Sequence, residues 1–580
     1  MFSFLRMIIK VFLFLFCMGL LWGQDLSRIA PKSVQTEKGT VTEERDKSGN
    51  PNNESDEAFL KDFQGLVLWE DELRFVPSGR GGVKGLEISM ELRHRDILER
   101  TLGSFFGQAL SVKGMRELQK RIESYFRNQE SIWVRVIIPE QKVKDGVLQM
   151  VVIKSSVGKI RVEGSRWFAA EDIRKEFRMK SGDPVQDQKM GDELDWINRN
   201  PFRQADLCLA PGDSLGKTDL ILKVRDRFPV RFYAGYEDSG NALTGKDRYL
   251  TGFNWGDAFF QGHQMNYQFT TSNPMSRFEA HSGSYVIPLP WHHELDFFGA
   301  YSEAEGRSAD LGIAGKSWQV SSRYQIPLPT LREVRQKVAF GYDFKQSNNN
   351  LEFGGQNVFT HLTDVSQFVG EYDGNLKDGW GSTHWGGKVF LSPGGMSEND
   401  RNTIYNESRA FAKADYAYGQ VELERKFQLP WGFSTRHSAI YQWSNGNLLG
   451  SEQLGLGGRD SVPGYEEREV NGDEGYLFQN EIWSPAGSAA DLLTYWGVSG
   501  LKGVKDRLQG LIFWDYGAVQ DRILLPSSDR EQILSSVGLG IRYTINTYVS
   551  FRADYGFQLT DFGQQNPGAS RIHMGLMVSY

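Results

Sequence analysis

The long C-terminal part of the chain, from about Phe228 to Tyr580, consists of strand after strand and contains no convincing helix. Within these strands, apolar residues alternate with charged residues and glycine. One face of a strand near the end carries Val537, Leu539, Ile541, Tyr543 and Ile545, with Gly538, Gly540, Arg542, Thr544 and Asn546 between them. Successive side chains of a strand point to opposite faces, so each strand has one apolar face and one face of charged residues and glycine.

A soluble periplasmic sandwich would also show alternation, so the deciding question is which face meets water. Here the apolar faces end in aromatic residues, and strands of about ten residues recur to the last position, which is typical of a membrane β-barrel with a polar lumen. We therefore predict a transmembrane β-barrel over residues 228–580. At about 22 residues for each strand and its connection, it has about 16 antiparallel strands.

Composition agrees with a chain of strands and tight turns, since the 580 residues include 63 Gly, 37 Phe and 22 Tyr. The 66 Lys and Arg residues against 73 Asp and Glu give a net charge of -7. This balance offers no basic excess, so we expect no nucleic-acid partner.

The N-terminus begins with two basic residues and a short apolar run, and residues 1–23 are predicted to be a signal peptide. A single membrane anchor is the alternative. Residues 24–61 are predicted to form a polar linker or a segment that plugs the pore. Removal of the signal peptide leaves Cys208 as the one cysteine, which excludes an intramolecular disulfide.

Between the linker and the barrel, two α/β units are predicted, over residues 62–156 and 157–227. Apolar residues recur at helical spacing twice between Arg93 and Gln129, and two strands follow, at residues 132–138 and 147–153. A second round shows the same order of strand, two helices and two strands. The two units repeat in structure more than in sequence.

Short motifs lie in both units, and their candidate residues are Pro139, Gln141, Gly146, Asn200, Pro201 and Phe202. These motifs resemble those of the two-partner secretion transporters, the haemolysin-activator family. The resemblance also includes Pro211-Gly212, Thr218-Asp-Leu220 and the junction from Val224 to Pro229. It runs from about Asp62 to Tyr580.

The resemblance implies two periplasmic polypeptide-transport-associated (POTRA) domains before a 16-stranded barrel in the outer membrane. It implies a secreted exoprotein as partner, caught extended and unfolded, with activation of a haemolysin-like or adhesin-like substrate as one outcome. Outer-membrane lipids are also implied, as is the barrel-assembly machinery that would read terminal Tyr580 as an insertion signal. An assembly factor for other barrels is the alternative function, although such factors usually carry more than two POTRA domains.

Residues of about 450–475 are similar to the family's long loop that folds back into the pore. Its tip residues here are Arg459, Val462, Pro463, Gly464 and Tyr465. In the family an arginine stands where this chain has Pro463, and it pairs with the aspartate of a Phe-x-Asp motif, here Phe513 and Asp515. Alternation places Asp515 on the lumen face.

With Pro463 in the arginine position, this lock cannot form in the usual way. One hypothesis is that Arg459 or Arg468 supplies the cation that faces Asp515. The alternative is that Pro463 and Gly464 stiffen the turn, and Asp515 finds water or another partner.

No arrangement of residues argues for an enzyme, a cofactor or a metal site. Ser214 matches a nucleophile-elbow pattern, but a strand follows it where that motif needs a helix. His292, His293 and Glu294 lie together without a second cluster that would complete a metal site.

Overall fold

The computed structural model describes residues 26–34, 36, 38–43, 57–241, 244–308, 311–331, 333–353, 356–498, 500–501, 503–525, 531–560 and 568–580. The predicted signal peptide, residues 1–23, lies outside the described residues. The chain divides into two compact units, of which one comprises residues 35–228 and the other residues 1–34 and 229–580. Among the described residues, no helix combines the length and the apolar character that a membrane crossing requires.

The first predicted POTRA domain has a four-stranded sheet in the order β4-β3-β7-β6, covered by two helices. A pair of short strands, β2 and β5, accompanies it. The elements are β2 (Ala58–Leu60), β3 (Gly65–Trp69), η3 (Glu72–Arg74), β4 (Gly85–Ile88), α2 (Arg95–Leu102), η4 (Gly103–Phe105), β5 (Leu110–Ser111), α3 (Val112–Gln129), β6 (Val134–Ile137) and β7 (Val147–Lys154).

Helix α3 shows why this domain folds as it does. The Ser111 hydroxyl accepts a hydrogen bond from Gly114 N at 3.1 Å and caps the first turn. Leu118 and Ile122, one turn apart, are completely buried against the sheet. Their burial provides most of the stability of a helix that would be marginal on its own.

The second predicted POTRA domain repeats this order, and its sheet has the order β1-β9-β10-β8. Its elements are β8 (Ser156–Glu163), α4 (Ala170–Glu176), α5 (Asp187–Asn198), β9 (Arg203–Pro211) and β10 (Lys217–Asp226), together with β1 (Val41–Glu43). Strand β1 comes from the predicted linker and pairs with β9 in parallel, with Val41 opposite Leu207. The prediction of a polar linker or plug over residues 24–61 did not include this three-residue strand.

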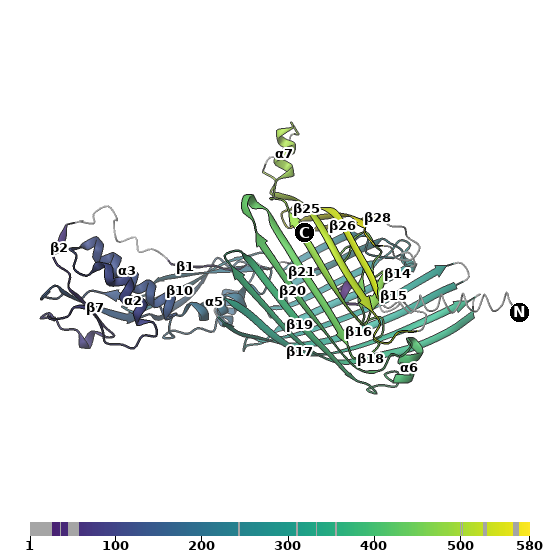
Figure 1. Ribbon diagram of the computed structural model, residues 1–580, viewed down its shortest axis with the longest axis horizontal. Coiled ribbons are helices and arrows are strands. Elements are labelled where there is room, and N and C mark those ends of the chain that lie inside the picture. The colour runs from purple at the N-terminus through teal and green to yellow at the C-terminus, as the bar shows by residue number, and fades with distance from the viewer. Residues whose placement is uncertain are drawn as a thin grey trace. The chain divides into compact units, whose positions relative to one another are not determined.

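The barrel is a closed sheet of 16 strands, which confirms the predicted fold class. Every strand pairs antiparallel with its neighbours, and β28 closes the barrel on β11. Figure 1 shows the strands running obliquely around it. Their bounds are β11 (Val230–Glu237), β12 (Arg248–Ala258), β13 (His263–Thr271), β14 (Phe278–Pro288), β15 (Glu294–Ser308), β16 (Leu311–Leu331), β17 (Val334–Phe353), β18 (Gln356–Asp378), β19 (Gly381–Pro393), β20 (Asp415–Gln428), β21 (Ser434–Ser444), β24 (Glu474–Trp483), β25 (Asp506–Gln520), β26 (Gln532–Ile545), β27 (Val549–Gln558) and β28 (Ser570–Ser579).

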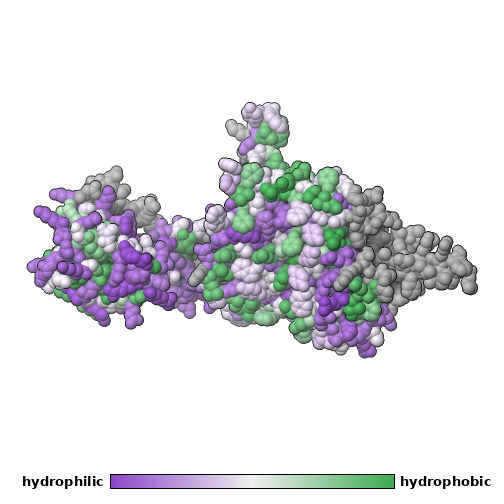
Figure 2. All heavy atoms as spheres, viewed as in Figure 1, coloured by the Kyte–Doolittle hydropathy of each residue, from purple (hydrophilic) through white to green (hydrophobic). Residues whose placement is uncertain are grey.

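Apolar side chains point away from the lumen of this barrel. Leu539 and Ile541 are 59% and 49% exposed, whereas Ser536 on the other face is fully buried. Apolar residues gather over the strands on the side shown in Figure 2, and the POTRA domains are mostly hydrophilic. This is the inside-out polarity of a barrel surrounded by lipid.

Short helices interrupt the connections between barrel strands, where the sequence pattern indicated none. They are η5 (Met275–Arg277), α6 (Asn402–Ser408), η6 (Pro430–Gly432) and α7 (Ala489–Tyr495). None has more than seven residues, so none is long enough to produce a clear helical period.

Candidate functional site: the lumen of the barrel

Residues 445–473 join β21 to β24, and within them a short hairpin pairs β22 (Leu454–Leu456) with β23 (Val470–Gly472). An apolar cluster packs this segment, called here the in-folded loop, against the inner wall. Its members are Leu454, Leu456, Val462, Tyr465 and Val470 of the loop and Leu477, Val519 and Leu534 of the wall. The loop is thus held inside the barrel by a small apolar core.

The loop tip lies against β26, β27 and β28. The Tyr465 hydroxyl, almost fully buried, lies 3.0 Å from Ser535 O and 2.8 Å from Thr560 O. The Gly464 carbonyl accepts a hydrogen bond from Gln558 Nε2 at 2.6 Å. Gly464 has a φ of +108°, which favours glycine at this turn.

Gly556 on β27 allows this close approach. A Cβ atom at this position would lie 2.4 Å from the Pro463 carbonyl oxygen. Since that distance is far inside van der Waals contact, any side chain at 556 would push the tip off the wall. Pro463 therefore sits where the loop backbone and the wall backbone touch.

Arg459 is the main charged anchor of the loop. Its guanidinium pairs with Glu237 of β11 at 3.0 Å and with Asp460 at 3.3 Å. Its backbone N–H donates to Glu467 at 3.1 Å, and its carbonyl accepts from Arg552 at 3.0 Å. The side chain is only 8% exposed, so its charge depends on these partners.

Arg552 extends this network along β27. It pairs with Asp460 of the loop at 2.8 Å and with Asp554 of its own strand at 2.9 Å. Arg542 of β26 also pairs with Asp554, at 2.7 Å. The charges of the loop tip are therefore continuous with charges of the inner wall.

The N-terminal segment, residues 26–34, lies in the lumen as well. Lys32 pairs with Glu237 at 3.0 Å, and its backbone N–H donates to the Tyr233 hydroxyl at 3.1 Å. Asn254 donates to the Lys32 carbonyl at 3.1 Å. Arg28 pairs with Glu467 of the in-folded loop. Glu237 thus holds the N-terminal segment and the loop at the same time.

Asp515 does not take part in this network, although the sequence hypothesis expected it to pair with an arginine of the loop. Its carboxylate is 2% exposed on the lumen side and accepts a hydrogen bond from Asn480 N at 3.3 Å. Among the residues that the structure describes, no lysine or arginine lies within 4.0 Å of it. Its neighbour Phe513 is also buried and lies beneath Gly538, where a Cβ would be 2.3 Å from the ring.

Neither proposed substitute cation faces Asp515, so that hypothesis is wrong. Arg459 is taken by Glu237 and Asp460. Arg468, with a φ of +52°, turns back into the loop and donates to the carbonyls of Gly450 and Gln453 at 2.9 and 3.0 Å. The loop tip lies against β27 and β28. In this position the side chain of Arg459 reaches Glu237 of β11.

The POTRA motif residues build the domains internally. Gln141 exchanges two hydrogen bonds with the Gln149 backbone, at 2.8 and 2.9 Å, and Pro139 O accepts a third from the same amide. Gly146 forms the turn before β7 with a φ of +70°. In the second domain, buried Asn200 accepts from Phe202 N at 3.1 Å, and Pro201 O accepts from Arg227 at 2.9 Å.

Tyr580 follows the last strand and completes the closing seam of the barrel. Its N–H donates to Phe232 O at 2.9 Å, and its carbonyl accepts from Phe232 N at 3.0 Å. Its side chain is 93% exposed.

Glu237, Glu467 and Arg552 are central to the lumen network, and the sequence motifs did not identify them. The signal available was alternation alone, which puts Arg552 and Asp554 on the face opposite Ala553. Alternation identifies lumen-facing charges but does not tell which of them meet, because most partners come from different strands or from the loop.

Comparison with known proteins identifies the family. The model of the "haemolysin secretion/activation protein ShlB/FhaC/HecB" family matches residues 216–543, and that of the "POTRA domain, ShlB-type" matches residues 83–155. The chain belongs to the ShlB/FhaC/HecB family. It is therefore an outer-membrane transporter of two-partner secretion, which secretes or activates a partner exoprotein, with its POTRA domains in the periplasm.

Individual relatives in this family are distant in sequence. The heme/hemopexin transporter protein HuxB of Haemophilus influenzae (strain 86-028NP) is 22% identical over 77% of this chain and 78% of its own length. The outer membrane transporter CdiB of Escherichia coli O6:K15:H31 is 24% identical over 67% of this chain and 66% of its own. The solved structure of CdiB from Escherichia coli has a TM-score of 0.68, 16% identity, and coverage of 96% and 95%, and so shares the fold.

Proposed function

We propose that this family member exports its exoprotein as an extended chain through the barrel lumen, after the N-terminal segment and the in-folded loop have moved. The observation that carries the proposal is the carboxylate of Glu237, which pairs with Lys32 of the N-terminal segment and with Arg459 of the in-folded loop. Both contacts are ionic and exchangeable. One carboxylate holds both segments, so a displacement of Glu237 releases the two together.

The first contact of the exoprotein is proposed to be a POTRA sheet edge. Strand β1 covers the edge at β9 with only three residues, Val41–Glu43, in parallel register with Leu207–Leu209. An extended peptide can add to such an edge through backbone hydrogen bonds and displace so short a strand. The six residues between Val34 and Val41 then link this displacement to the N-terminal segment in the lumen.

The remaining parts of the proposal concern chemistry and assembly. The protein is proposed to act without catalysis or a cofactor and without nucleic acid, and to contact outer-membrane lipids through its apolar outer face. Its insertion is proposed to use the barrel-assembly machinery, with exposed Tyr580 as the recognised end. We also propose that the first POTRA domain spans residues 62–156, the second POTRA domain residues 157–227 and the barrel residues 228–580.

Substitution of the shared carboxylate tests the export route. Glu237→Gln removes the partner of both Lys32 and Arg459, and partly buried charges that lose a partner cost well over the 1.4 kcal/mol that corresponds to a tenfold change. We expect the open fraction in planar-bilayer recordings to rise about tenfold or more. Glu279→Gln, on a strand of the same barrel, is the control, because among the described residues the one ion-pair partner of Glu279 is His281.

Deletion of the gene distinguishes secretion from assembly of other barrels. We expect one or a few large exoproteins to disappear from the medium and surface while the other outer-membrane barrels keep their amounts. A general fall of outer-membrane barrels would favour the assembly function instead. An unchanged open fraction in Glu237→Gln would reject the coupled release and leave the secretion function in place.

A further inference from the structure

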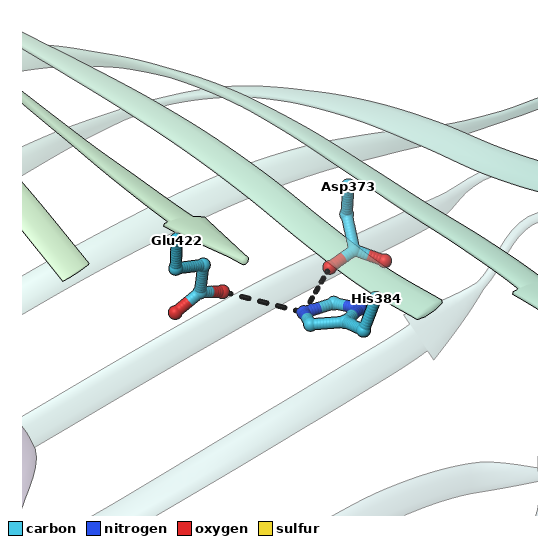
Figure 3. Close-up of side chains that lie close together, drawn as sticks. All are labelled: Asp373, His384 and Glu422. Atoms are coloured by element: carbon cyan, nitrogen blue, oxygen red, sulfur yellow. Dashed lines mark hydrogen bonds and ion pairs between the residues drawn. The ribbon is translucent and has the colours of Figure 1, made fainter. Parts of the chain in front are cut away.

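Three ligand-type side chains meet on the inner wall, away from the in-folded loop. They are Asp373 of β18, His384 of β19 and Glu422 of β20, which come from three adjacent strands (Figure 3). His384 lies three residues after Gly381, where β19 begins at the turn from β18. That turn is at the same end of the barrel as the start of β11, which is the periplasmic end.

The spacing of the donor atoms suits a metal ion. His384 Nε2 lies 3.3 Å from a Glu422 oxygen and 3.5 Å from an Asp373 oxygen, and one donor atom of each residue lies within 4.8 Å of the others. Charge-assisted hydrogen bonds are usually about 2.7–2.9 Å long. Two donors on a tetrahedral ion with bonds of about 2.0–2.1 Å are separated by about 3.3 Å, which matches the observed spacing.

Gly386 leaves the space between the two carboxylates open. In the strand register it lies directly between Asp373 and Glu422. A Cβ atom at Gly386 would lie 2.7 Å from Glu422 Oε1. Gly386 lies within β19 and does not have a positive φ, so its backbone conformation does not demand glycine. What the missing side chain provides is room for Glu422 to lean over β19.

The charge balance around these residues also favours a cation. Neighbouring wall carboxylates have guanidinium partners: Asp343 and Glu371 share Arg323, and Glu424 and Glu481 share Arg436. Asp373 and Glu422 have His384 alone within ion-pair distance among the described residues. Lys337 lies opposite Asp373 in the register, yet pairs with neither carboxylate.

We propose that Asp373, His384 and Glu422 bind one divalent transition-metal ion of the zinc class. One imidazole nitrogen and two carboxylate oxygens are ligands that Zn²⁺ takes in proteins, and three protein ligands leave a position for water on the lumen side. The ion connects three adjacent strands at the periplasmic mouth of the barrel and neutralises two like charges.

Zinc titration of the full-length protein tests the site. The purified transporter in detergent micelles is stripped with a chelator and titrated with ZnCl₂ in a calorimeter. We expect one ion per chain for the wild type, and an affinity at least about tenfold lower for His384→Ala and for Gly386→Ala. Gly386→Ala keeps all three ligands and only displaces Glu422, so its effect reports geometry.

Controls keep a folding defect apart from loss of the site. Each variant must show the gel mobility of a folded barrel before heating, and Glu422→Gln replaces Gly386→Ala if the latter fails. His281→Ala removes a histidine with a single carboxylate partner and should bind zinc like the wild type. The proposal is overturned if the wild type binds no zinc, or if folded His384→Ala and Glu422→Gln bind it with unchanged affinity.

Discussion

Helix α3 of the first POTRA domain and strand β26 of the barrel use periodic apolar residues in opposite ways. On α3, Leu118 is fully buried against a sheet, and charged Lys120 is exposed. On β26, Leu539 is exposed, and Ser536 is buried. A period therefore separates two faces of an element, but it does not tell which face meets water, because that depends on what surrounds the element.

The inside of the barrel explains the difference. A closed sheet of 16 strands is too wide for its own side chains to fill. The lumen is occupied instead by the in-folded loop and the N-terminal segment, whose charges need charged partners on the wall. The first POTRA domain closes instead over an apolar core of side chains from its sheet and helices.

The largest effect is expected in the POTRA core. Leu118→Ala removes a completely buried side chain, and we expect a loss of ~2–5 kcal/mol in stability, because a cavity adds to the lost burial. Hydrogen exchange of β7 in the full-length protein measures it. Lys120→Ala on the same helix should change exchange little, and equal effects of both substitutions would contradict the assignment of α3 faces.

The second-largest loss of stability is expected from a charge on the outer face of the barrel. Leu539→Arg places a guanidinium in the hydrocarbon near the middle of β26, and we expect a cost of ~2–4 kcal/mol in barrel stability. Urea titration in lipid vesicles, read by gel mobility, measures it, with Leu539→Ala as control. A tolerated arginine would show that this face meets water, and the inside-out comparison would fail.

A smaller, pH-dependent effect is expected in the second POTRA domain at Glu176, which pairs with Arg199 at 3.1 Å and with Arg203. Burial raises the pKa of Glu176, but the two arginines outweigh it and lower this pKa below its ordinary value. The stabilisation is therefore present above the unfolded-state pKa of about 4.3 and is lost as the pH falls through the folded value.

Glu176→Gln should reduce the stability of the second POTRA domain by ~1–3 kcal/mol at pH 7 and flatten its acid dependence below about pH 4. Urea unfolding at both pH values, followed by hydrogen exchange of α5, measures this. Glu171→Gln on the same helix is the control, because Glu171 is exposed. A variant as pH-dependent as the wild type would assign the acid sensitivity to another group.

The smallest effect is expected at Asp515. An asparagine there can still accept the hydrogen bond from Asn480 N, and no cation loses a partner among the described residues. Asp515→Asn should leave the open fraction in bilayer recordings near that of the wild type, whereas Arg459→Ala should raise it. If Asp515→Asn opens the channel as much as Arg459→Ala, the tip is held through Asp515 after all.

Much of this architecture could be predicted from the sequence, because it depends on local patterns. The helices of the first POTRA domain follow from apolar spacing, and the strand count follows from the length of the alternating region. Strand β1 could not be predicted, since three residues carry no period and gain a strand only by pairing with β9. The short helices between barrel strands were not predicted either, because they are also too short to show a period in the sequence.

Alternation in the sequence by itself determined that Asp515 and Arg552 face away from the apolar side of their strands, and the resemblance to the family placed Arg459 in a loop. Only the tertiary structure decided that Arg459 meets Glu237 rather than Asp515, and that His384 meets two carboxylates. The physical reason is register: pairing of strands and seating of the loop bring together residues that are far apart in the chain, and the energy of a charge depends on its actual neighbours.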